Sequence, residues 1–138
     1  MPEITTNLKP TDTIQLEGDT YEVIQNRLSE RGRKIFPEIE SFINEAKNVL
    51  KDNLLGAFLF GSVSRGQETE QSDIDILILV KQYDYKLRLK ISKLTSAYSL
   101  TNDLLISPLL KDQINWEKNH YHNTLLYQEI RRDGIQLC

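Results

Sequence analysis

Two aspartates, Asp73 and Asp75, stand at the start of an apolar run that continues through Val80. On a β-strand, side chains two residues apart point to the same face, about 6.6 Å apart along the strand. Both carboxylates would therefore project together at the rim of a core, where their repulsion raises a pKa. A divalent cation relieves that repulsion, and hard oxygen ligands suit Mg²⁺ or Mn²⁺. The pair predicts a metal site.

A glycine turn precedes this acid pair. Gly61 follows the apolar run of residues 54–60, and Ser62 comes directly after it. Glycine lets the backbone approach a ligand closely, and a serine hydroxyl with free backbone N–H groups at the start of a short helix binds anions. Arg65 is the basic residue of this loop, and it is either a phosphate contact or a surface arginine beside two glutamates. An anion site next to a dicarboxylate metal site predicts a nucleoside triphosphate with its metal as the ligand.

The elements that position these residues follow from the hydrophobic periodicity. Apolar runs predict three strands, at residues 54–60, 73–80 and 103–107. Helical spacing predicts four helices. The first begins at Asp19 and is broken or bent at Gly32, and the second has Pro37 near its first turn. The third covers residues 83–100, and the last runs from about Ile114 to Gly134 in one or two pieces. The order predicts an α/β (α+β) fold, a small mixed sheet with helices packed on it.

Length and composition limit the class of protein. A chain of 138 residues favours one domain, with residues 1–18 as a loosely held arm and 19–138 as the folded unit. The net charge of −3 argues against a protein that coats nucleic acid. The single cysteine, Cys138, excludes an internal disulfide framework and fits a reducing compartment. No apolar run approaches the roughly 20 residues of a membrane helix and no signal peptide is apparent, so we expect a cytoplasmic protein with no membrane partner.

Together, the glycine turn and the acid pair resemble the signature of the nucleotidyltransferase superfamily. This superfamily includes DNA polymerase β, kanamycin nucleotidyltransferase and the stand-alone minimal nucleotidyltransferases. Its signature is a Gly-Ser pair, ten residues and then Asp-x-Asp. Here Gly61 and Ser62 are followed by ten residues and then by Asp73 and Asp75. The resemblance spans about residues 54–110, and the strand context on both sides makes it far more specific than either motif alone.

The resemblance implies a role for each matching residue. Gly61 and Ser62 would hold the β- and γ-phosphates, and Asp73 and Asp75 would bind the metals. The family often has a third carboxylate on a later strand, which bridges a metal or deprotonates the attacking hydroxyl. Asp103, expected to open the third strand, is the candidate for this role. The alternative is that the Asn-Asp pair at this position is an ordinary turn before a strand.

Two details of the loop bear on the resemblance. Arg65 with Gly66, and Ser72 just before the acids, also look like the family. Many members have an arginine directly after the Gly-Ser pair, whereas this sequence has Val63. Phosphate binding by the loop would therefore depend on Arg65, unless that residue is a surface arginine.

The activity implied by the resemblance is metal-dependent transfer of a nucleoside monophosphate, with AMP from ATP favoured, to an acceptor hydroxyl with release of pyrophosphate. The acceptor would be a protein hydroxyl, as in family antitoxins that adenylylate a small helical ribonuclease toxin, or a small molecule such as an aminoglycoside. The short chain leaves little room for a large acceptor domain, which favours a partner protein. The alternative is a weak or inactive binding module that neutralises its partner by contact.

Aromatic and histidine residues of the C-terminal part have simpler interpretations. Trp116, Tyr121 and Tyr127 are expected on helix faces in the core rather than in a base-stacking platform. His120 and His122 have no third ligand at a suitable spacing, so a zinc site is not predicted.

Overall fold

A computed structural model describes residues 20–118 and 124–138. The predicted N-terminal arm, the expected helix start at Asp19, and Tyr121 with the two histidines lie outside the described residues. The described elements, in chain order, are α2 (Thr20–Arg27), α3 (Glu30–Leu50), the 3₁₀ turn η2 (Lys51–Asn53), β1 (Leu54–Phe60), α4 (Gly61–Ser64), β2 (Ile74–Val80), α5 (Tyr85–Asn102), β3 (Ile106–Asp112), α6 (Gln113–Lys118), α7 (Leu125–Asp133) and β4 (Ile135–Gln136). No helix in this described part is long and apolar enough to cross a bilayer.

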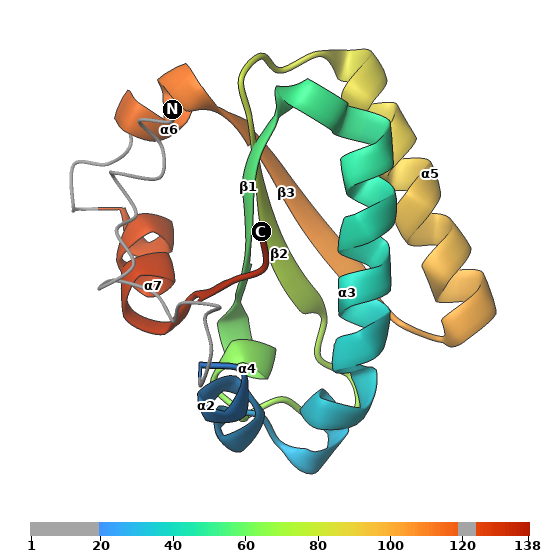
Figure 1. Ribbon diagram of the computed structural model, residues 1–138, viewed down its shortest axis with the longest axis vertical. Helices are drawn as coiled ribbons and strands as arrows, with labels where there is room; N and C mark the ends of the chain where they lie inside the picture. Colours follow the sequence, from blue (N-terminus) through green and yellow to red (C-terminus); the bar gives the residue numbers. More distant parts are fainter. Residues whose placement is uncertain (1–19, 119–123) are drawn as a thin grey trace.

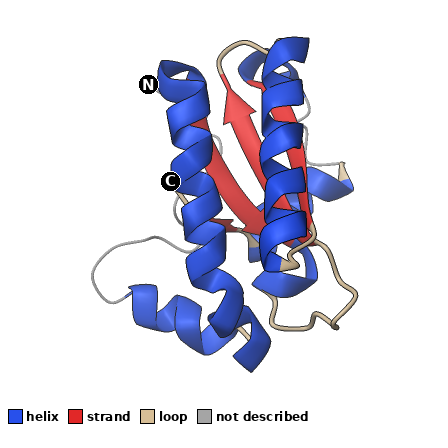
Figure 2. Ribbon diagram, turned by 90° about the vertical axis from the view of Figure 1, so that its right-hand side faces the viewer, coloured by secondary structure: helices blue, strands red, loops and turns tan. Residues whose placement is uncertain are grey.

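The four strands form one mixed sheet in the order β3-β2-β1-β4. β1 pairs antiparallel with both β2 and β4, whereas β2 pairs parallel with β3. Helices α3 and α5 cover one face of the sheet, and α6 and α7 lie on the other side (Figures 1 and 2). The predicted fold class, a small mixed sheet with helices packed on it, is confirmed.

Strand β2 supplies both faces of the sheet with apolar side chains. Its residues Ile74, Ile76 and Ile78 belong to the buried cluster formed with α3 and α5. Leu77 and Leu79 belong to a second cluster on the α6–α7 side, because successive side chains of a strand point to opposite faces. Alternation predicted this division of β2 correctly.

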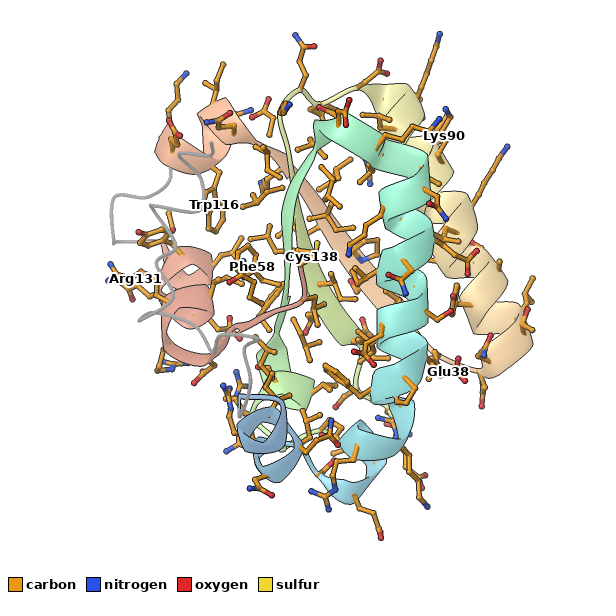
Figure 3. The ribbon with its side chains drawn as sticks, in the orientation of Figure 1. Glu38, Phe58, Lys90, Trp116, Arg131 and Cys138 are labelled. Carbon is orange, nitrogen blue, oxygen red and sulfur yellow. The ribbon has the colours of Figure 1, made fainter. Side chains whose placement is uncertain are left out.

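The second cluster confirms the core prediction for two aromatic residues. Trp116 of α6 and Tyr127 of α7 are 1% and 3% exposed, and their ring centroids lie 5.7 Å apart. Figure 3 shows Trp116 and Phe58 on this side of the sheet. Both rings therefore anchor the C-terminal helices on the face from which Asp75 also projects.

The boundary between the first two helices differs from the prediction. The break lies at Ser29 and not at Gly32, because the Ser29 hydroxyl accepts a hydrogen bond from the backbone N–H of Gly32 at 2.9 Å and caps α3. Gly32 therefore sits in the first helical turn, and Pro37 lies inside α3 rather than near its start.

The third strand begins later than predicted. β3 runs from Ile106 to Asp112 and includes Pro108, whereas the predicted strand ended at residue 107. The backbone N–H of Ile74 donates to the carbonyl of Leu105 at 2.8 Å. In a parallel ladder every second residue of a strand bonds to a given neighbour, so the nitrogen of Pro108 points away from β2. Because β3 is an edge strand, proline breaks no ladder hydrogen bond at that position. The two-residue strand β4 was not predicted, since so short a segment carries no periodic signal.

Candidate functional site

The site begins where β1 ends. Phe60, the last residue of β1, is paired in register with Asp75 of β2. Gly61 follows in the left-handed region with a φ of 79°. A Cβ on Gly61 would overlap Oδ2 of Asp75 and lie 3.2 Å from its Cγ. The conformation and the close approach both require glycine, so the fold brings the glycine turn and the acid pair into contact.

The loop after Gly61 is held by its own hydrogen bonds. The buried hydroxyl of Ser64 donates to the carbonyl of Gly61 at 2.7 Å. The carbonyl of Ser62 accepts from the backbone N–H groups of Arg65 and Gln67 at 3.2 and 2.9 Å. Ser62 itself is partly exposed. The backbone of the loop is therefore fixed while its second residue remains accessible to a ligand.

Arg65 connects this loop to α7. Its guanidinium forms an ion pair with Glu129 at 3.1 Å and lies 3.7 Å from a carboxylate oxygen of Asp133. It also donates to the side-chain oxygen of Gln67 at 3.2 Å. The guanidinium of Arg65 is therefore held by two acids of α7. Glu129 was missed by the sequence analysis, although its spacing of four residues from Asp133 places both acids on one helix face.

The electrostatics of the site centre on Asp75. Burial raises the pKa of its carboxyl above the ordinary value, and the negative charges of Asp73 and Glu129 raise it further, while Arg65 lowers it. Asp73 lies just before β2 and is exposed. A cation at this pair would offset the repulsion. Mg²⁺ in proteins typically takes one or two carboxylates together with substrate phosphates, and this donor set fits that pattern.

Asp103 does not open the third strand, contrary to the prediction. It is the left-handed C-cap of α5, with a φ of 57°, a conformation that aspartate tolerates better than most residues. It is exposed, and the β3 residue in register with Asp75 is Ser107. Within residues 20–118 and 124–138, no three carboxylate, histidine or cysteine side chains gather as a metal site. Asp103 therefore ends α5 rather than opening β3, and in the described residues it is not part of a three-ligand cluster with the acid pair.

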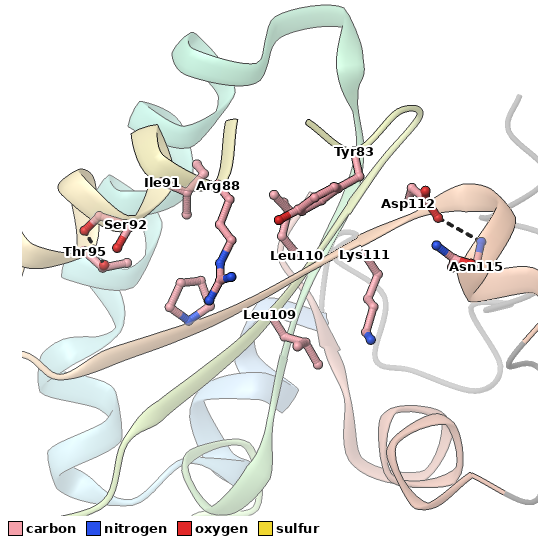
Figure 4. Close-up of a pocket in the computed structure, with 11 residues that line it drawn as sticks. Tyr83, Arg88, Ile91, Ser92, Thr95, Leu109, Leu110, Lys111, Asp112 and Asn115 are labelled. Carbon is pink, nitrogen blue, oxygen red and sulfur yellow. Dashed lines mark hydrogen bonds between the residues drawn. The ribbon is translucent and has the colours of Figure 1, made fainter. Parts of the chain in front are cut away.

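A separate groove of about 580 Å³ runs between α5 and β3. Figure 4 shows Tyr83 and Arg88 reaching toward β3, with Lys111 on the strand itself. None of the candidate site residues predicted from the sequence (Gly61, Ser62, Arg65, Asp73, Asp75 and Asp103) lines this groove. The glycine turn and the acid pair lie elsewhere, at the end of β1 and the start of β2.

Comparison with known proteins identifies relatives on three grounds. The sequence model of the family described as Polymerase beta, Nucleotidyltransferase matches residues 43–138. Two proteins of Methanocaldococcus jannaschii that are named as protein adenylyltransferases are 45% identical over 78 residues and 34% identical over 91 residues. These alignments cover 56% and 64% of this chain and 79% and 87% of the relatives.

Two solved structures are similar in fold. A toxin–antitoxin structure with AMP-PNP is 25% identical with a TM-score of 0.51, and the match covers 72% of each chain. An MntA–HpeT toxin–antitoxin structure is 24% identical with a TM-score of 0.50, again over 72% of each chain.

Replacing Gly61 by alanine tests the close approach to Asp75. We expect Gly61→Ala to lower the free energy of unfolding by about 1–3 kcal/mol, because a left-handed residue with a side chain is strained and the new Cβ overlaps the carboxylate. Gly56→Ala, within β1, is the control, since its Cβ would meet Phe58 at an ordinary 3.4 Å. Urea unfolding of both variants measures the difference. Equal destabilisation by the two substitutions would contradict this account.

Replacing Asp75 by asparagine tests its electrostatic environment. Since the pKa of Asp75 is raised in the folded protein, this carboxyl favours folding while it is protonated and opposes folding once pH rises through the raised pKa. Asp75→Asn should therefore raise the Tm by about 1–4 °C at pH 7 in metal-free buffer. The difference in Tm between Asp75→Asn and the wild type should shrink as pH falls toward 4. Thermal scans across this range measure it, and a wild-type protein more stable than the variant at pH 7 would refute the assignment.

Proposed function

Since the chain belongs to the family Polymerase beta, Nucleotidyltransferase, we propose that it transfers AMP from ATP to a hydroxyl group of a partner protein. The observation that carries the proposal is the contact between Gly61 and the Asp75 carboxylate, because it joins a phosphate-binding loop to a metal-binding pair. The relatives named as protein adenylyltransferases support a protein acceptor. The similar toxin–antitoxin structure with AMP-PNP, an ATP analogue, supports the nucleotide.

The proposal assigns each side chain a task. Gly61 and Ser62 hold the β- and γ-phosphates, with the Ser62 hydroxyl at the accessible rim of the loop. Asp73 and Asp75 hold Mg²⁺ or Mn²⁺, which when bound neutralises charge on the phosphoryl oxygens. Arg65 acts indirectly, since its bonds to α7 fix the end of the loop. In the reaction the acceptor oxygen bonds to the α-phosphorus, the bond to the pyrophosphate oxygen breaks, and the hydroxyl proton is released.

A partner protein would supply the acceptor hydroxyl on the side of the acid pair that faces β3. In the β2–β3 register, the neighbour of Asp75 is Ser107, and Leu105 at the same end is 56% exposed. These residues offer neither a charge nor a base to the acceptor. We therefore propose that the partner brings its own hydroxyl and its surroundings to this open side. The toxin–antitoxin context of the similar structure favours a small helical toxin-like protein as this partner.

A label-transfer assay tests the proposal. The chain is incubated with ATP labelled at the α-phosphate, Mg²⁺ and the protein encoded beside it, and labelled protein is measured. We expect transfer by the wild type and a loss of about 10²-fold or more in Asp75→Asn, because such electrostatic groups contribute on that scale. Asp52→Asn is the matched control, since Asp52 is exposed at the other end of β1, and it should retain full transfer.

Other outcomes would replace the proposal with a different function. If the wild type transfers no label and Asp75→Asn still neutralises the partner, the chain is a binding module. Label on a small hydroxyl compound such as an aminoglycoside, and none on protein, would make it a small-molecule nucleotidyltransferase. Equal activity of Asp75→Asn and Asp52→Asn would remove the acid pair from the mechanism.

A further inference from the structure

Arg27, the last residue of α2, joins three parts of the fold. Its Nη2 donates to the backbone carbonyl of Ser64 at 2.9 Å and to that of Asp133 at 2.6 Å. Ser64 ends α4, directly after the glycine turn, and Asp133 ends α7. Helix α2 lies beside α4 at this end of the molecule (Figure 1) and precedes residues 43–138, the part that the family model matches.

The same loop meets the end of α2 at two further points. Gly66 has a φ of 70°, and a Cβ there would overlap the carbonyl oxygen of Arg27. Ser29, which follows α2, donates from its hydroxyl to the carboxylate of Glu68. The loop is therefore held against residues 27–29 by a guanidinium, by a close backbone contact and by a hydroxyl.

These contacts lead directly to the glycine turn. One of the two carbonyls that accept from Arg27 belongs to Ser64, and the hydroxyl of Ser64 in turn donates to the carbonyl of Gly61 at 2.7 Å. Gly61 packs on the carboxylate of Asp75. A displacement of Ser64 would therefore be passed to the residues proposed to hold the phosphates and would weaken their contacts with the nucleotide.

We propose that Arg27 is a positioning residue that sets the geometry of the Gly61–Ser62 turn, so that α2 controls the affinity for the nucleoside triphosphate. This inference rests on the proposed function. In the proposed function Arg27 touches neither the nucleotide nor the acid pair. It acts through the carbonyls of Ser64 and Asp133.

Arg33 provides a matched control. Its Nη1 donates to the carbonyls of Gln25 at 3.0 Å and Leu28 at 2.7 Å. It thus makes two carbonyl bonds, as Arg27 does, but both partners belong to α2 or to the residue just after it. Arg33→Gln removes bonds of the same kind and number and leaves the loop untouched. Loss of stability alone would affect both variants, whereas loss of loop geometry would affect only Arg27→Gln.

Steady-state kinetics with the full chain and its protein acceptor, at varied ATP, measures the effect. We expect Arg27→Gln to raise the KM for ATP about tenfold, equivalent to about 1.4 kcal/mol, with a smaller change in kcat. Arg33→Gln should change KM less than about twofold, within the 0.5 kcal/mol expected of sites outside the network. Arg27→Lys, which keeps a cationic donor on a shorter side chain, should give an intermediate KM. Equal KM values for Arg27→Gln and Arg33→Gln would overturn the inference.

Amide hydrogen exchange of the ligand-free chain separates this inference from the proposed function. Peptides covering residues 61–68 should exchange faster in Arg27→Gln than in Arg33→Gln or the wild type. If the wild type neither binds ATP nor transfers AMP from it, the proposed function fails, and the control of nucleotide affinity fails with it, whatever the exchange shows. If AMP transfer occurs but loop exchange in Arg27→Gln matches that in Arg33→Gln, only the role of Arg27 is overturned. Faster exchange with an unchanged KM would also overturn it.

Discussion

The backbone of Gly61 passes so close to the carboxylate of Asp75 that no side chain fits between them. This approach is possible because β1 and β2 are antiparallel neighbours whose register sets Phe60 opposite Asp75. The chain must then turn through a left-handed glycine to leave the strand. The sheet, the turn and the acid pair therefore depend on one another. Arg65 from the loop and Arg27 from α2 hold the turn from two further directions.

The same strand serves the core and the site at different points along its length. Beyond Asp75, the side chains of β2 on that face are leucines buried under α6 and α7. A carboxylate at the rim of this apolar layer is partly desolvated, which with Asp73 and Glu129 raises its pKa. The folded protein without a ligand thus holds a group that opposes its own stability. Sites that bind cations commonly accept such a cost, because the ligand restores the balance.

Local patterns made the fold class and the pairing of the glycine turn with the acids predictable. Strand alternation around Asp75 depends on period two alone, and the spacing of the Gly-Ser and Asp-x-Asp motifs is visible in one stretch of sequence. The missed features depend on distant residues. Pro108 lies inside β3 only because that strand is at the sheet edge, and Arg27 bonds to a carbonyl 37 residues away. No local signal marks either one.

In the proposed function, the triphosphate and its metal bind where Gly61 meets Asp75. Anomalous diffraction from crystals grown with Mn²⁺ and AMP-PNP tests it most directly, because manganese scatters anomalously and its position is read without reference to activity. We expect a manganese peak between the carboxylates of Asp73 and Asp75, with the triphosphate along the Gly61–Ser62 turn. Nucleotide density in the groove between α5 and β3, with no manganese at the two aspartates, would contradict it.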